Sequence, residues 1–165
     1  MLLRDGTEVP SRPVRADDGD RERHLFDRLS ERSRYQRFMQ HLAQLTPQML
    51  ERFTRLDYPR ELALAALDPA GDEFIAVARY APRAEAGSAE FALVVLDEWQ
   101  RKGLGRALLE RLCAAARDAG YEALYGHVLT DNLEMLELAR KLGFEVVGRD
   151  GADLTVARRL NPTMG

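Results

Sequence analysis

The stretch that decides the fold is Ala89–Gly120, with the sequence AEFALVVLDEWQRKGLGRALLERLCAAARDAG. It begins as an apolar strand, turns at Gly103 and Gly105, and continues as a helix with leucines at helical spacing on one face. The first N–H groups of a helix have no partner within the helix, and glycines let an anion approach the backbone closely. The pattern therefore predicts a phosphate site where the strand ends and the helix begins.

Length and composition limit the domain number, the partners and the cellular compartment that we expect. The 165 residues, 45% of them hydrophobic, suit one domain spanning 1–165 with a sizeable core. The 24 basic and 27 acidic residues give a net charge of -3, so no general basic field favours nucleic acid as a partner. The single cysteine, Cys113, argues against disulfides and favours a reducing compartment. Without a signal-like start or a long apolar run, we expect a cytoplasmic protein with no membrane partner.

The first third of the chain reads as an edge strand followed by helices. Residues 8–14 form a weak strand interrupted by Pro10 and Pro13. A first helix is expected over roughly 18–29 with Asp17 or Asp18 as its N-cap, and a second within the basic, aromatic segment 30–38. Thr46-Pro47 resembles the start of a third helix.

Strands dominate the rest of the chain. Apolar runs at 61–67, 73–81 and 89–96 are joined by short connections, which fit an antiparallel meander. The run 89–96 is apolar on both faces and is expected to be a central strand covered on both sides. After the helix ending near Gly120, we expect a parallel strand at 122–130, a helix from 131–132 to Gly143 and a hairpin of 144–147 with 154–158. The fold class is α/β, a mixed sheet with helices on both faces.

A motif at the turn points to a family. Gln100–Gly105, QRKGLG, resembles the acyl-coenzyme A pyrophosphate loop of the GCN5-related N-acetyltransferases (GNAT), written Gln/Arg-x-x-Gly-x-Gly/Ala. A bare Gly-x-Gly often only starts a helix, but here strand, turn and helix follow in order. Asn132–Phe144 also resembles the later helix of that family, in which an asparagine contacts the cofactor arm. The Walker sequence of nucleoside triphosphate loops is absent.

The resemblance extends from Leu3 to Leu160, and segments such as 30–38 and 77–80 look most like the acetyltransferase domain of bacterial protein lysine acetyltransferases that modify acyl-CoA synthetases. It implies a GNAT-type, mostly antiparallel sheet of about seven strands, acetyl-CoA as co-substrate, no metal, and a protein lysine as the acceptor amine. The implied cofactor-binding residues are Leu93, Val94, Val95, Gln100, Arg101, Lys102, Gly103, Leu104, Gly105, Arg106 and Asn132.

Glu90 is the candidate catalytic residue. An alkylammonium has no lone pair, so a base must take its proton before it attacks a thioester. Glu90 is the carboxylate within the most apolar strand, where burial would raise its pKa, and it matches the catalytic glutamate of the lysine acetyltransferases. The alternative is an edge glutamate paired with Arg79 or another cation. Backbone N–H groups at Leu93 to Val95 would polarise the thioester carbonyl if the strand is splayed there.

Ala139 departs from the family pattern. Many members have a tyrosine four residues before the helix-closing glycine, as the acid towards the departing thiolate. Either that acid is dispensable here, or Tyr80, Tyr125 or His127 replaces it; a lone strand histidine such as His127 is more often a packing residue. Arg34, Tyr35 and Phe38 are candidates for the acceptor wall or are plain surface. Two further functions stay open: acetylation of a small amine, and a non-catalytic acyl-CoA-binding module.

Overall fold

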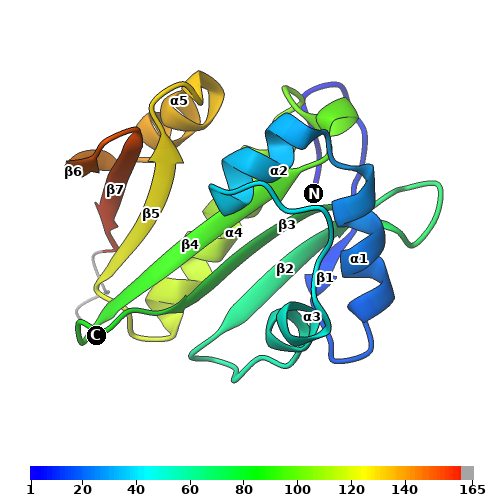
Figure 1. The fold of residues 1–165 in the computed structure, drawn as a ribbon, viewed down its shortest axis with the longest axis horizontal. Coiled ribbons are helices and arrows are strands. Elements are labelled where there is room, and N and C mark those ends of the chain that lie inside the picture. The colour runs from blue at the N-terminus through cyan, green and yellow to red at the C-terminus, as the bar shows by residue number, and fades with distance from the viewer. Residues whose placement is uncertain (161–165) are drawn as a thin grey trace.

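The computed structural model describes residues 1–160, so the last five residues of the expected 1–165 domain lie outside it. Helices α1 to α3 lie on one face of a twisted sheet and α4 on the other (Figure 1). The elements in chain order are β1 (Ser11–Pro13), α1 (Gly19–Arg28), α2 (Glu31–Phe38), α3 (Pro47–Thr54), β2 (Leu62–Leu67), β3 (Phe74–Pro82), β4 (Ser88–Val95), the 3₁₀ turn η1 (Asp97–Trp99), α4 (Leu104–Asp118), β5 (Ala123–Leu129), α5 (Leu133–Lys141), β6 (Glu145–Asp150) and β7 (Asp153–Arg159). The expected α/β class is confirmed.

The strands form one seven-stranded sheet in the order β1-β2-β3-β4-β5-β7-β6. Within residues 1–160, β4 and β5 are the only strands that pair in parallel, which confirms the predicted meander, crossover and terminal hairpin. The N-terminal strand is shorter than expected, because only Ser11–Pro13 pairs with β2 and Glu8 instead bridges Leu2. A proline lacks the N–H that a sheet ladder needs; Pro10 directly precedes this short segment and Pro13 is its last residue.

Helix starts follow the sequence closely, with one exception. Ser30, Thr46 and Asn132 each accept a hydrogen bond from the backbone N–H three residues later, as N-caps do. Asp18 is the N-cap residue of α1, as one of the two expected alternatives, but its side chain makes no capping hydrogen bond. Its buried carboxylate instead accepts hydrogen bonds from both terminal nitrogens of Arg12 and from the Arg15 N–H. Chiefly the bond from Arg12 lowers the pKa of Asp18 to about 2.

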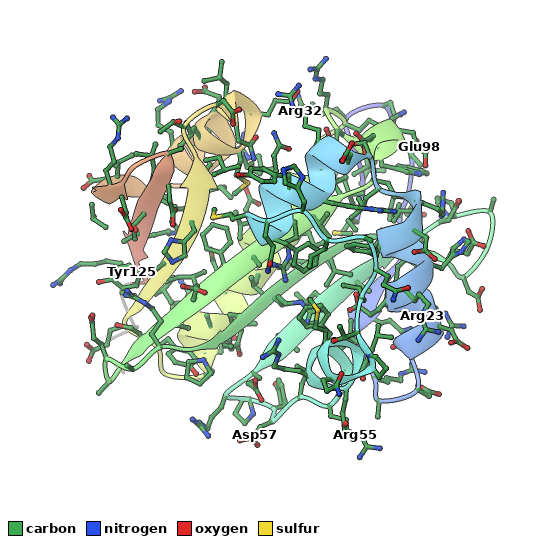
Figure 2. The ribbon with its side chains drawn as sticks, viewed as in Figure 1. Arg23, Arg32, Arg55, Asp57, Glu98 and Tyr125 are labelled. Carbon is green, nitrogen blue, oxygen red and sulfur yellow. The ribbon has the colours of Figure 1, made fainter. Side chains whose placement is uncertain are left out.

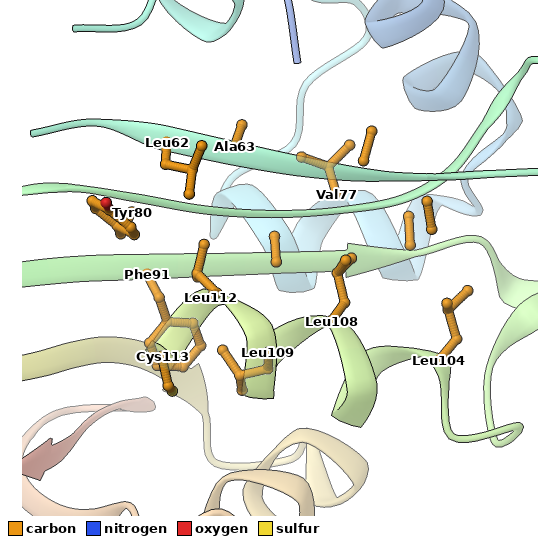
Figure 3. Packing of buried hydrophobic residues seen from close by; sticks show 14 of the residues in the cluster. Leu62, Ala63, Val77, Tyr80, Phe91, Leu104, Leu108, Leu109, Leu112 and Cys113 are labelled. Atoms are coloured by element: carbon orange, nitrogen blue, oxygen red, sulfur yellow. The ribbon is translucent and has the colours of Figure 1, made fainter. Parts of the chain in front are cut away.

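The main core fills the space between the sheet and α4. Leu104, Leu108 and Leu112 point from α4 towards the strands, where they meet the layer that contains Tyr80 and Phe91 (Figure 3). All three leucines are at most 1% exposed. This packing fixes the axis of α4, and therefore the place where its N-terminus meets the end of β4.

The opposite face of the sheet holds a buried ion pair. Arg79 on β3 donates to the Glu22 carboxylate of α1 at 2.6 Å and to the Phe53 carbonyl at 3.1 Å. Desolvation raises the pKa of Glu22 and lowers that of Arg79, while the charge of each partner opposes the shift. Other charged side chains, such as Arg23, Arg55 and Glu98, project from the outside of the molecule (Figure 2).

Strand β4 is central, as predicted, but it is not covered on both sides along its whole length. Its ladder with β5 spans only Ser88–Phe91 against Ala123–Gly126, and the two strands diverge beyond it (Figure 1). Residues 92–95 are consequently only half buried. The last pair of the ladder is tightly packed: a Cβ on Gly126 would lie 2.2 Å from the Phe91 ring. The apolar pattern of 92–95 therefore lines an opening rather than a closed core.

Candidate active site

A cavity of about 1110 Å³ occupies the opening beside the second half of β4. Its walls come from β4, the start of α4, helices α2 and α5, the ends of β5 and β7, and the N-terminal segment 2–4. Ten of the twelve predicted site residues line it: Glu90, Leu93, Val94, Val95, Gln100, Arg101, Gly103, Gly105, Arg106 and Asn132. The other two lie elsewhere, since Leu104 is a core residue and the Lys102 ammonium stands 5.6 Å from the Trp99 ring centroid.

The turn that enters α4 has the geometry of an anion site. Gly103 adopts φ +88° and Arg101 φ +65°, so two left-handed residues reverse the chain within three positions. Among the described residues no side chain caps α4, in contrast to α2, α3 and α5. The first N–H groups of this 15-residue helix are thus left for a ligand, and Gly103, Gly105 and Arg106 line the cavity there.

The cations around the turn are partly neutralised. Arg101 pairs with Glu134 of α5, and Arg106 with Glu110 one turn further along α4. Arg4, which the sequence analysis missed, lies across the turn: its Nε would be 3.3 Å from a Cβ on Gly103. No local pattern marks a residue at position 4 as a neighbour of position 103. The bridge between Leu2 and Glu8 folds this segment back and holds it at the cavity wall.

The turn is also bonded to the opposite wall. Gln100 donates through Nε2 to the Val95 carbonyl at 2.9 Å and approaches the Ser33 hydroxyl at 3.5 Å. The Asp97 carboxylate accepts hydrogen bonds from the Ser30 N–H and from the hydroxyls of Ser30 and Ser33. Helix α2 is therefore fastened to the segment that joins β4 to α4.

Glu90 lies at the other end of the cavity and is not buried. Its side chain is 47% exposed and lines the cavity, so the predicted burial is wrong, although its backbone lies within the β4–β5 ladder opposite Tyr125. The alternative pairing with Arg79 is also wrong, because Arg79 pairs with Glu22. Glu90 instead contacts His127 Nε2 at 2.9 Å, and His127 Nδ1 contacts Asp153 at 3.1 Å. Asp153 on β7 was not predicted from the sequence.

The structure separates the three candidates for the missing tyrosine. The Tyr80 hydroxyl donates to the Pro59 carbonyl in the core, and burial raises its pKa to about 12. Tyr125 lies beneath the Arg83 guanidinium, 3.8 Å from it. Of the three, only His127 belongs to the cavity lining formed by residues 1–160, so the packing interpretation of this histidine is wrong. Ala139 is buried in α5.

Helix α2 supplies the wall near Glu90. Arg37 and Phe38 line the cavity, whereas Arg34 packs on the Phe26 ring and Tyr35 against His41. Within residues 1–160 the Arg37 guanidinium has no hydrogen-bond or ion-pair partner, and its closest recorded neighbour is the Phe38 ring at 4.6 Å. Burial, with repulsion from Arg79, lowers the pKa of Arg37 to about 10, which leaves it charged at neutral pH.

Two classes of site are not seen in the described chain. Among residues 1–160, no three His, Cys, Asp or Glu side chains are grouped so that they could hold a metal ion. No helix of that part of the chain is long and apolar enough to cross a membrane.

Comparisons with known proteins show the family to which the chain belongs. The model of the acetyltransferase (GNAT) family matches residues 24–144. The chain belongs to the GNAT acetyltransferases. It is 34% identical over 155 residues to an acetyltransferase of Pseudomonas aeruginosa, covering 93% of this chain and 83% of that one. It is also 30% identical over 151 residues to the acetyltransferase Pat of Mycolicibacterium smegmatis, covering 91% of this chain but only 45% of that protein.

A solved structure is similar over nearly the whole GNAT chain. The GNAT domain of PAT from S. lividans has a TM-score of 0.90 and 31% identity, covering 96% of this chain and 94% of that one. The family assignment, the seven-stranded fold and the N-acetyltransferase activity predicted from the sequence are confirmed.

Proposed function

We propose that this GNAT enzyme transfers the acetyl group of acetyl-CoA directly to a protein lysine, with Glu90 as the general base. One observation supports the proposal above others: the uncapped start of α4 and the Glu90 carboxylate line the same cavity. From Glu90 to Leu96 is six residues of strand, about 20 Å at roughly 3.3 Å per residue. That length is comparable to an extended pantetheine arm.

The cavity fits acetyl-CoA at both ends. Its diphosphate would lie on the first N–H groups of α4, with Arg4, Arg101 and Arg106 supplying charge. The β4 backbone from Ala92 onward has no β5 partner, so N–H groups on that edge are available to the thioester carbonyl. Asn132 lines the cavity, but its side-chain oxygen caps α5, which leaves the amide NH₂ for the cofactor arm.

Direct transfer needs little beyond a positioned base. Glu90 removes a proton from the acceptor ammonium, the neutral amine attacks the thioester carbonyl carbon, and the carbon–sulfur bond breaks. The second amine proton goes to the departing thiolate. The balanced reaction releases one proton for each acetyl group transferred.

Two features support a protein lysine as the acceptor. Glu90 and Asp153 place partly exposed carboxylates near one another in the cavity wall, which suits an approaching ammonium. The resemblance to protein lysine acetyltransferases in the sequence agrees with the similarity to the PAT domain.

Arg37 favours a second candidate acceptor, a small amino acid. A free amino acid that presents its amine to Glu90 also brings a carboxylate, and Arg37 is a charged guanidinium in the same cavity without a partner among residues 1–160. A lysine within a polypeptide has no such carboxylate.

The test is release of CoA from acetyl-CoA with two acceptor panels, lysine-containing proteins and free amino acids, using the wild type and Glu90→Gln. The matched control is Glu145→Gln, because Glu145 is an exposed strand glutamate of β6 outside the cavity lining. We expect turnover on a protein, loss of kcat by about a hundredfold or more in Glu90→Gln, and wild-type rates in the control.

Other outcomes would contradict separate parts of the proposal. Turnover only on free amino acids, abolished by Arg37→Gln, would replace the protein acceptor. Full activity of Glu90→Gln would remove Glu90 as the base. Tight acetyl-CoA binding with no turnover on any amine would leave only a binding module.

A further inference from the structure

His127 is bonded on both sides by carboxylates. Its Nε2 lies 2.9 Å from Glu90 of β4, and its Nδ1 lies 3.1 Å from Asp153 of β7. The three residues come from three neighbouring strands, near the point where the β4–β5 ladder ends. They form a row that leads from the proposed base to the side of the sheet formed by β7.

The row restricts where protons lie. An ionised carboxylate only accepts hydrogen bonds, and a neutral imidazole has a single N–H to donate. If both carboxylates are ionised, the two short contacts require the imidazolium; if His127 is neutral, one of the two carboxylates must itself be protonated and donate to the ring nitrogen that lacks a hydrogen. In every arrangement that satisfies both contacts, one proton lies between Glu90 and His127 and another between His127 and Asp153.

The reaction produces one proton per turnover that Glu90 cannot retain; Glu90 is itself partly exposed in the unliganded protein, and its contact with His127 gives the proton a further route to solvent. A protonated Glu90 is no base for the next ammonium. Glu90 touches His127, and the His127 side chain is 38% exposed, so the imidazole connects the base to solvent. Imidazole is the side chain whose charge ordinarily changes between about pH 5 and 8.

We propose that His127, oriented by Asp153, passes to solvent the proton that Glu90 takes from the acceptor amine; this rests on the proposed function of Glu90. In one cycle Glu90 accepts the amine proton and hands it to Nε2. This transfer returns Glu90 to the carboxylate and makes His127 the imidazolium, which then gives its Nε2 proton to a water molecule at the exposed ring and keeps the Nδ1–H that Asp153 holds. Asp153 stays ionised and holds the ring with Nε2 towards Glu90. Glu90 touches the acceptor, whereas His127 is a relay residue and Asp153 a positioning residue.

Other charged groups line the same cavity. Glu137 and Lys141 come from α5, Arg37 comes from α2, and Arg4, Arg101, Arg106, Glu110 and Glu134 surround the entry to α4. Tyr125 precedes His127 by two positions on β5 and is covered by Arg83. Among the recorded contacts of His127, only Glu90 and Asp153 are within hydrogen-bonding distance in residues 1–160.

The deciding experiment is chemical rescue of steady-state acetyl transfer. His127→Ala should lower kcat about tenfold to a hundredfold with little change in KM for acetyl-CoA, and added imidazole should restore much of that loss with saturation. Glu90→Gln should not be rescued, because the imidazole then has no base to serve. His24→Ala is the matched control, since His24 is an exposed histidine of α1 that contacts Glu73 far from the cavity, and it should leave kcat unchanged.

A second measurement does not depend on turnover. In the unliganded protein, the ring ¹⁵N resonances of His127 should shift in both Glu90→Gln and Asp153→Asn, while those of His24 should not. Asp153→Asn should lower kcat by less than His127→Ala, because an amide oxygen can still accept the Nδ1–H.

The proposal is overturned by full kcat in His127→Ala, by a loss that imidazole does not restore in a folded variant, or by His127 resonances that ignore both substitutions. Absence of turnover in the wild type on every amine is a different result: it rejects the proposed function on which the relay rests.

Discussion

Gly126→Ala should destabilise the protein, although a strand normally gains from that substitution. An alanine in a strand interior is favoured over glycine by about 0.5–1 kcal/mol, because the unfolded glycine is more flexible. Here the added Cβ would lie 2.2, 2.5 and 2.8 Å from three atoms of the Phe91 ring, which itself packs 5.1 Å from the Phe144 ring centroid. Overpacking of this kind costs about 1–3 kcal/mol. We therefore expect a net loss of about 1–2 kcal/mol.

Gly148→Ala is the matched control. Gly148 is also in a strand, and its added Cβ would find nothing closer than 3.7 Å. Urea and thermal unfolding of both variants give the comparison; for a chain of this size each 1 kcal/mol corresponds to about 2–4 °C in Tm. Gly126→Ala should melt several degrees below wild type and Gly148→Ala at or above it. Equal stability of the two variants would refute the packing argument, and Phe91→Leu should relieve part of the loss.

Three further predictions concern stability and the turn. The Asp18 carboxylate, with its pKa near 2 in the fold, contributes about 2 kcal/mol to the free energy of unfolding; this contribution is present above about pH 4 and is lost as the pH falls towards 2. Asp18→Asn should remove it, so the free energy of unfolding of this variant should differ less between pH 7 and pH 3 than that of the wild type. Glu22→Ala leaves Arg79 buried without its carboxylate and should cost about 3–5 kcal/mol in urea unfolding, whereas replacing both partners by apolar residues should cost less. Gly103→Ala forces an alanine into the left-handed conformation, which costs about 1–2 kcal/mol of conformational free energy, and should weaken acetyl-CoA binding measured by calorimetry. The control Gly71→Ala adds a methyl group in open space and should bind acetyl-CoA as the wild type does.

Local sequence patterns predicted most helices and strands. The features of the site that were not predicted depend on contacts between segments far apart in the sequence. The strand, turn and helix at 89–120, the cap at Thr46, and the parallel crossover each follow from neighbouring residues. The predicted burial of Glu90 was wrong because apolar neighbours along the strand do not reveal that the side chain at this position lines an open cavity. Asp153 and Arg4 reach the cavity only through the pairing of β7 with β5 and the folding back of the N-terminal segment. The Asp18 side chain does not cap α1 because Arg12, which is only partly buried, binds its carboxylate instead.

The Asp97 contacts to Ser30 and Ser33 join the segment that leads into the proposed diphosphate site to helix α2, which forms the wall near Glu90. The proposed binding regions for acetyl-CoA and for the acceptor are therefore structurally coupled. A ligand that orders the start of α4 also restrains η1, and η1 holds the first turn of the helix facing Glu90. Exchanging α2 for that of a relative, in order to change the acceptor, should preserve these serines. Without them the exchanged helix is expected to disturb the affinity for acetyl-CoA as well.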